Sequence, residues 1–255
     1  MAHHEQSAAM SRLCPAGAMI DLATADTVAT AGGYARLLGR ASATPVPVRN
    51  GSVRWHQFDG PVGEGQDGDV DENSPSGSHR VSFGVADRVS AARLLQRRGL
   101  APTEPVHVTE DTGAMEMHGP EVNGGDITAI DHLVFTAPSR DRALAVFGAC
   151  LDLDFRLDRE IGDGARQLFF RAADLVVEVV TGSAQATGDA QPCSLWGVAW
   201  RSQDAELTHR RLGDLGVSTS EVRIGRKPGT RLFTVRDPAL ATRTVVIETD
   251  TGHTV

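Results

Sequence analysis

The sequence predicts an α+β fold built from four copies of one strand–helix–sheet unit. The first observation behind this prediction is an internal correspondence at a shift of 113 residues. It places Asp26 on Ser139 at two expected helix starts, and Gly39 on Asp152 at two expected helix ends. A fixed shift between similar segments is typical of a duplicated unit.

The second observation is a shift of 117 residues, which relates Asp87 and Gly99 to Asp204 and Gly216. In both pairs a strand of apolar residues precedes the aspartate, a helical stretch follows it, and the glycine comes 12 residues later. Aspartate and serine are favoured N-cap residues, and glycine is favoured just after a helix end. The chain therefore contains two related pairs of units.

The elements follow the same order in each unit. Short apolar strands, such as MIDLA, IDHLVF and LWGVAW, precede the helices TADTVATAGGYARLLG, DRVSAARLLQRRG, SRDRALAVFGAC and DAELTHRRLGDLG. Extended segments with turn residues come after the helices: GSVRWHQFDG, GAMEMHGPEV, ARQLFFRAADLVVEVV and TRLFTVRDPALATRTVVIET. The four predicted units are residues 17–62, 78–121, 127–182 and 194–250.

Two stretches are predicted linkers because they are acidic or rich in glycine and serine: GEGQDGDVDENSPSGS and TGSAQATGDAQP. The segment EVNGGD marks the expected domain boundary. The predicted organisation is a disordered N-terminal segment at 1–16, a first domain at 17–122 and a second domain at 127–250.

Composition excludes several classes of function. The formal net charge of −8 gives no basic field for nucleic acid or an anionic membrane. No apolar run approaches the ~20 residues that span a bilayer, and the N-terminus lacks the apolar region of a signal peptide. The three widely spaced cysteines, Cys14, Cys150 and Cys193, favour a reducing cytoplasm. We therefore expect a cytoplasmic protein with a small-molecule ligand, either as a monomer or as a homodimer.

The segments IDHLVF, LVVEVV, WGVAWRSQDAELTHRRLGDLGV and GRKPGTRLFTVRD with TRTVVIE resemble the vicinal oxygen chelate superfamily. This superfamily includes glyoxalase I, bleomycin-resistance proteins, methylmalonyl-CoA epimerase and extradiol dioxygenases. The resemblance covers nearly the whole chain and implies two tandem glyoxalase-like domains. Each would pair two βαβββ modules into a curved mixed sheet around a cavity.

The resemblance also implies a metal site. Metal-using members place one ligand on the first strand and one on the last strand of each module. In the second domain these positions would be His132, Glu178 and Glu248, whereas the fourth falls at Gly197 or Trp196, neither of which binds a metal. One imidazole and two carboxylates suit Zn²⁺, Ni²⁺, Mn²⁺ or Fe²⁺. Glu178 or Glu248 would then act as the catalytic base.

The first domain is degenerate at the matching positions. The repeat puts Met19 opposite His132, Arg80 (next to His79) opposite Gly197, and Glu116 on the last strand, and a one-residue choice of register offers His56 or Gln57. This set is a poor divalent-metal site. The first domain is therefore expected to be either a scaffold or a site for an anionic ligand that contacts Arg80 and Gln57.

Four more residues are candidate ligand contacts in the second domain. Trp196 and Trp200 are four apart in a strand and are expected on one face, where they would stack on a planar ligand or pack in the core. Arg226 and Lys227 precede a Pro–Gly turn and would either grip a carboxylate or phosphate, or lie solvated.

Three functions remain open on the sequence. The first is metal-dependent lyase or isomerase chemistry through an enediolate. The second is metal-free binding or sequestration of a small molecule, as in bleomycin-resistance proteins. The third is a scaffold that dimerises through its sheets.

Overall fold

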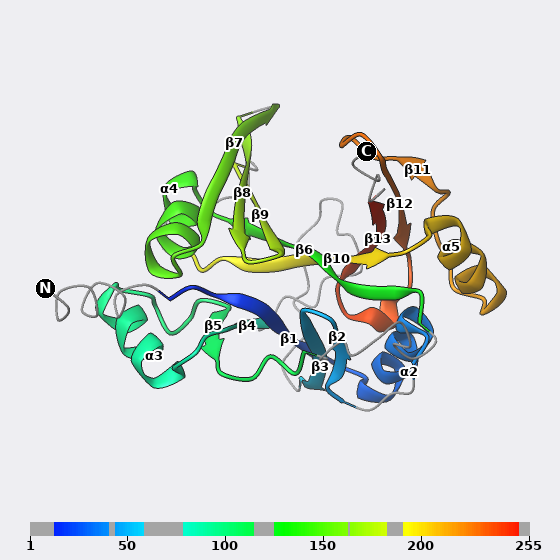
Figure 1. Ribbon diagram of the computed structural model, residues 1–255, viewed down its shortest axis with the longest axis horizontal. Helices are drawn as coiled ribbons and strands as arrows, with labels where there is room; N and C mark the ends of the chain where they lie inside the picture. The colour runs from blue at the N-terminus through cyan, green and yellow to red at the C-terminus, as the bar shows by residue number, and fades with distance from the viewer. Residues whose placement is uncertain are drawn as a thin grey trace, which may run out of the picture.

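The computed structural model describes residues 13–40, 44–58, 79–114, 125–162, 164–182 and 191–249. It confirms the predicted α+β class, with two curved mixed sheets and their helices (Figure 1). Most of the expected N-terminal segment and acidic linker, and Glu116 with its strand, lie outside the described residues. The domain limits at 17–122 and 127–250 remain predictions.

The first sheet has five strands in the order β2-β3-β1-β4-β5. Strand β1 is parallel to β3 and antiparallel to β4, and β5 is parallel to β4. Within the described ranges, the first unit contributes two strands after its helix and the second contributes one. The strands are β1 (Ala16–Thr24), β2 (Val46–Val48), β3 (Gly51–Gln57), β4 (Arg80–Gly84) and β5 (Val106–Thr109).

The second sheet has eight strands in the order β11-β12-β13-β10-β6-β9-β8-β7, and both of its units are complete. Its centre is the antiparallel pair β6 and β10, and the two arms β7–β9 and β11–β13 rise on either side of it (Figure 1). The strands are β6 (Ile127–Ala137), β7 (Asp154–Gly162), β8 (Ala165–Ala172), β9 (Leu175–Thr181), β10 (Ser194–Ser202), β11 (Arg223–Ile224), β12 (Thr230–Val235) and β13 (Arg243–Thr249).

The helices begin at the predicted caps. The side chains of Asp26, Asp87, Ser139 and Asp204 each accept a hydrogen bond from a backbone N–H of the first turn. The helices are α2 (Thr27–Leu38), α3 (Arg88–Arg97), α4 (Arg140–Ala143) continuing into the π-helical η1 (Leu144–Cys150), α5 (Ala205–Asp214), and the short 3₁₀ helix η2 (Pro238–Leu240). None of the helices in the described ranges is both long and apolar enough to cross a membrane.

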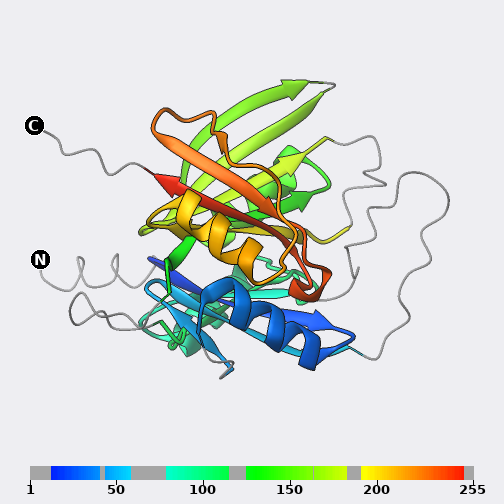
Figure 2. The ribbon, with the colours of Figure 1, turned by 90° about the vertical axis from the view of Figure 1, so that its right-hand side faces the viewer.

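The two domains share one apolar core. The first unit packs on the fourth, and α2 and α5 lie side by side in Figures 1 and 2. The buried ring of Tyr34 on α2 meets that of Trp200 edge-on at 6.2 Å, and its hydroxyl donates to Leu240 O at 3.2 Å. The second unit packs on the third, where Arg98 donates to Cys150 O at 2.9 Å. Contacts between the first and fourth units and between the second and third units therefore join the two sheets.

Candidate functional site

The concave face of the second sheet encloses a cavity of about 1470 Å³. Alternate residues of its strands reach this cavity because successive side chains of a strand point to opposite faces. On β9, for example, Val176, Glu178 and Val180 line the cavity while Val177 and Val179 are fully buried in the core. The floor of the cavity is therefore a sheet face on which apolar and polar side chains are mixed.

A β-bulge in β6 brings two adjacent polar side chains to this cavity. His132 pairs with Ala199 and Ile130 pairs with Trp200, so Asp131 is an extra residue between the two pairs. Asp131 and His132 consequently both line the cavity. The side chain of Asn50, from the first domain, holds Ile130: Ile130 N donates to Asn50 Oδ1 and Asn50 Nδ2 donates to Ile130 O, each at 2.9 Å.

Five side chains form a polar cluster on the cavity floor. His132 Nδ1 lies 3.0 Å from Asp131 Oδ1, and Arg201 Nε donates to Asp131 Oδ2 at 3.0 Å. His132 Nε2 lies 3.9 Å from Glu178 Oε2, and Gln167 donates to the other Glu178 oxygen. Burial alone would raise the pKa of Asp131, but the hydrogen bond and charge of His132 and the charge of Arg201 hold that pKa below its ordinary value. Asp131, Gln167 and Arg201 are not marked as site residues by the sequence, in which only the position of Asp131 next to His132 is a signal.

The structure brings together His132 and Glu178 but not Glu248, which corrects the expected set. Val245, Ile247 and Thr249 of β13 line the cavity, so Glu248 points to the other face. There its carboxylate accepts a hydrogen bond from Ala205 N at the start of α5, at 2.9 Å. The expectation failed because the position matching Glu178 lies three residues earlier than assumed, on Val245.

Strand register identifies this match. His132 pairs with Val176 on β9, and its counterpart Gly197 pairs with Arg243 on β13, so two residues further on Glu178 corresponds to Val245. The four positions in the second domain are therefore held by one histidine, one glutamate, one glycine and one valine.

This donor set does not fit a divalent metal ion. Protein sites for zinc and similar metals use at least three side-chain ligands. Within the described part of the chain, no three His, Cys, Asp or Glu side chains are arranged to hold a metal. A Cβ added at Gly197 would lie only 3.0 Å from Arg243 O, so this position cannot carry a ligand side chain without moving β13.

The two tryptophans lie on opposite faces of β10, contrary to the shared face expected from their spacing. Trp196 is 46% exposed at the cavity, and the Arg243 guanidinium lies 4.6 Å from its ring centre. Trp200 is fully buried in the core. The register of β10 against β6 shifts between Leu195 and Gly197 and again between Ala199 and Trp200, which breaks the simple alternation. Trp200 is therefore not a ligand contact.

The lining of the cavity carries more cationic than acidic side chains. Arg226 and Lys227 line the cavity together with five further arginines, of which Arg201 belongs to the floor cluster and Arg49 forms an ion pair with Asp174. Asp131, Asp174 and Glu178 are the acidic residues among the described lining. The additional arginines are Arg49, Arg159, Arg171, Arg201 and Arg223.

The first sheet carries a different set at the matching positions. Val134 pairs with Glu178 and Gly197, and its counterpart Asp21 pairs with Arg54 and Arg80. Arg54 therefore matches Glu178, which corrects the choice of His56 or Gln57, while Met19 and Arg80 stand where the repeat placed them. Gln57 is exposed and donates to Ala25 O at 2.9 Å, away from the hollow of this sheet.

Known structures share this architecture. The structure is similar to a variant of 4-hydroxymandelate synthase from Streptomyces coelicolor at 15% sequence identity, over 94% of this chain and 94% of that chain, with a TM-score of 0.62. It is also similar to methylmalonyl-CoA epimerase from Mycobacterium tuberculosis at 17% identity, over 51% of this chain and 93% of that chain, with a TM-score of 0.42. No family model and no curated protein matches the sequence. The first likeness extends over both domains and concerns the fold.

Proposed function

We propose that the second domain of this chain, which has the two-domain fold of the vicinal oxygen chelate superfamily, binds a small organic anion without a metal ion. The observation that carries the proposal is the pairing of apolar and aromatic side chains with an excess of cationic ones in the lining of the cavity. An apolar pocket with a few placed polar groups is typical of small-molecule sites.

Each part of the cavity has a role in this proposal. Trp196 offers a face for a planar apolar body, and Arg226 and Lys227 attract and hold an anionic group. His132 and Glu178 present a nitrogen and a carboxylate oxygen on the floor, where they hydrogen-bond to polar atoms of the ligand. Asp131 and Gln167 fix these two side chains, so the floor is ordered before the ligand arrives.

The small number of metal-binding side chains favours metal-free ligand binding over metal-dependent lyase or isomerase chemistry. Lewis-acid chemistry needs an ion held by the protein, and two of the four positions that strand register identifies are Gly197 and Val245. His132 and Glu178 supply one donor each, with their remaining atoms engaged by Asp131 and Gln167.

Metal analysis tests the metal-free part of the proposal. Protein purified without chelator is expected to hold well below one equivalent of zinc, nickel, manganese or iron, because two donors do not retain these ions. His132→Ala is expected to leave the content unchanged, as is His56→Ala, which removes an exposed histidine elsewhere. One equivalent in the wild type that is lost in both His132→Ala and Glu178→Ala, but kept in His56→Ala, would overturn the proposal.

Binding of 8-anilinonaphthalene-1-sulfonate, a planar aromatic anion, tests the ligand class. Saturable binding with energy transfer from tryptophan is expected. Trp196→Ala, or Arg226→Ala combined with Lys227→Ala, is expected to weaken the dye about tenfold, which corresponds to about 1.4 kcal/mol. Leu207→Ala and Arg210→Ala serve as controls, because both residues are exposed on α5 and neither lines the cavity. Equal dye affinity in the cavity variants and the controls would contradict the assignment.

A further inference from the structure

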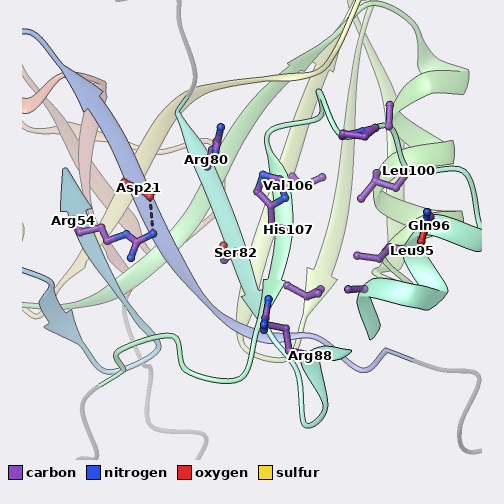
Figure 3. A pocket seen from close by; sticks show the side chains of 14 residues that line it. Asp21, Arg54, Arg80, Ser82, Arg88, Leu95, Gln96, Leu100, Val106 and His107 are labelled. Carbon is purple, nitrogen blue, oxygen red and sulfur yellow. Dashed lines mark hydrogen bonds and ion pairs between the residues drawn. The ribbon is translucent and has the colours of Figure 1, made fainter. Parts of the chain in front are cut away.

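The first domain has its own hollow, of about 540 Å³, at the place that corresponds to the cavity of the second domain. Strands β1, β3, β4 and β5 contribute polar side chains to it, and α3 with the loop that follows contributes an apolar wall (Figure 3). The accessible apolar residues of this wall are Leu100, Ala101 and Pro102, whereas Leu95 and Val106 are buried in the core. Two duplicated domains thus present two separate hollows.

Two matching positions carry a positive charge in this hollow but not in the second domain. Arg54 takes the position of Glu178, and Arg80 takes that of Gly197. Ser82 pairs with Met19 and His107, just as Ala199 pairs with His132 and Val245, so His107 takes the position of Val245. A position held by a carboxylate in one domain is therefore held by a guanidinium in the other.

Most of this positive charge is not neutralised by the protein. Asp21 is the acidic residue among the described lining, and its carboxylate is taken by Arg54 Nη2 at 2.7 Å and by His56 Nδ1 at 2.8 Å. Among the described residues, neither the Arg80 nor the Arg88 guanidinium forms an ion pair, although the backbone N–H of Arg88 donates to Glu110 Oε1 at 3.1 Å and one carboxylate therefore lies beside the start of α3. Burial, and then the charge of Arg80, lower the pKa of His107 below its ordinary value.

The uncompensated groups lie in one row. Arg80 and Ser82 point to the same face of β4, His107 is beside Ser82 on β5, and Arg88 is the first residue of α3. In Figure 3, Ser82 and His107 lie between Arg80 and Arg88. Two guanidinium groups separated by neutral donors match an anion with more than one charge, because each fork can hold a pair of oxygens.

We propose that the first-domain hollow binds a small phosphate-bearing molecule, with Arg80 and Arg88 on its anionic oxygens, Ser82 and His107 as further hydrogen-bond partners, and its organic part on the wall of Leu100, Ala101 and Pro102. This site is distinct from the cavity of the second domain and takes a ligand of higher charge. It gives the degenerate half of the chain a binding role in place of a purely structural one.

Titration calorimetry with inorganic pyrophosphate tests the site. Saturable binding is expected in the wild type, with affinity lowered at least tenfold in Arg80→Ala and in Arg88→Ala, and with little binding of acetate, which carries one charge. Arg97→Ala is the matched control, since Arg97 is exposed on α3 and does not line the hollow. Thermal melting confirms that each variant is folded, which is expected because Arg80 and Arg88 are exposed.

Several results would overturn the proposal: no pyrophosphate binding, equal binding of acetate, or equal affinity in Arg80→Ala, Arg88→Ala and Arg97→Ala. The result is independent of the second domain, because Trp196→Ala and Arg226→Ala leave the first-domain hollow intact and are expected to bind pyrophosphate as the wild type does.

Discussion

Replacement of Asn50 by alanine is expected to lower the free energy of unfolding by about 3 kcal/mol, because it leaves two buried backbone groups without partners. Asn50 is 6% exposed, and its amide satisfies both the N–H and the carbonyl of Ile130. Its side chain makes with Ile130 the two hydrogen bonds that a neighbouring strand would otherwise make, next to the β-bulge that contains Asp131. The same change is therefore expected to loosen the floor of the second-domain cavity as well as the contact between domains.

Urea unfolding followed by circular dichroism measures the loss of stability. Gln57→Ala is the control: its amide is exposed and makes one bond to Ala25 O, so a change within about 0.5 kcal/mol is expected. Asn50→Asp keeps the acceptor for Ile130 N but sets an anionic oxygen against Ile130 O, so it is expected to be no more stable than Asn50→Ala. Wild-type stability in Asn50→Ala would show that the two hydrogen bonds between Asn50 and Ile130 do not stabilise the fold.

Removal of the Glu104 carboxylate is expected to have an effect of similar size. Glu104 follows α3 in the first domain, and its side chain is fully buried. It accepts a hydrogen bond from Cys193 N at 3.0 Å, just before β10, and forms an ion pair with Arg142 on α4. It therefore joins the second unit to the third from inside the shared core.

Glu104→Ala is expected to destabilise the protein by about 3 kcal/mol, the lower end for a broken buried ion pair, since Arg142 is 27% exposed and is partly solvated. For a chain of this size the melting temperature is expected to fall by roughly 10 °C. The double variant Glu104→Ala, Arg142→Ala is expected to lose less than the sum of the two single losses, since it leaves no unpaired charge.

Differential scanning calorimetry of these variants provides the measurement. Asp154→Ala is the matched control, because its ion pair with Arg156 is exposed on both sides, at 59% and 57%, and such pairs contribute less than about 1 kcal/mol. A loss in Glu104→Ala no larger than that in Asp154→Ala would be incompatible with Glu104 as a buried link between the domains.

Much of the fold was predictable because the repeat is marked by residues with backbone preferences. The four N-caps lie at the predicted positions. Gly39 and Asp152, which the shift of 113 residues aligned as helix ends, both have positive φ, at +64° and +56°. Gly99 and Gly216 likewise have φ of +81° and +73°. Helix starts and ends can therefore be predicted from a single sequence when such residues mark them.

The candidate site was less predictable because it depends on strand register. The resemblance to the superfamily pointed to His132 and Glu178, and both are polar residues within apolar strands. The placement of Glu248 was three residues out of register, and any odd shift moves a side chain to the other face of a sheet. The placement of Trp200 failed because the register shifts in β10 break the simple alternation of faces. The bulge at Asp131 and the register shifts in β10 lie where distant segments meet, as Asn50 meets Ile130. The local sequence therefore does not predict them.

The close approach of β13 to Gly197 also affects how easily a metal site could be built into this cavity. A histidine at 197 or a glutamate at 245 would add a third donor to His132 and Glu178. A Cβ at 197 would lie 3.0 Å from Arg243 O, so β13 would have to give by a few tenths of an ångström. The tight strand contact therefore makes 245 the easier of the two positions at which to add a metal ligand.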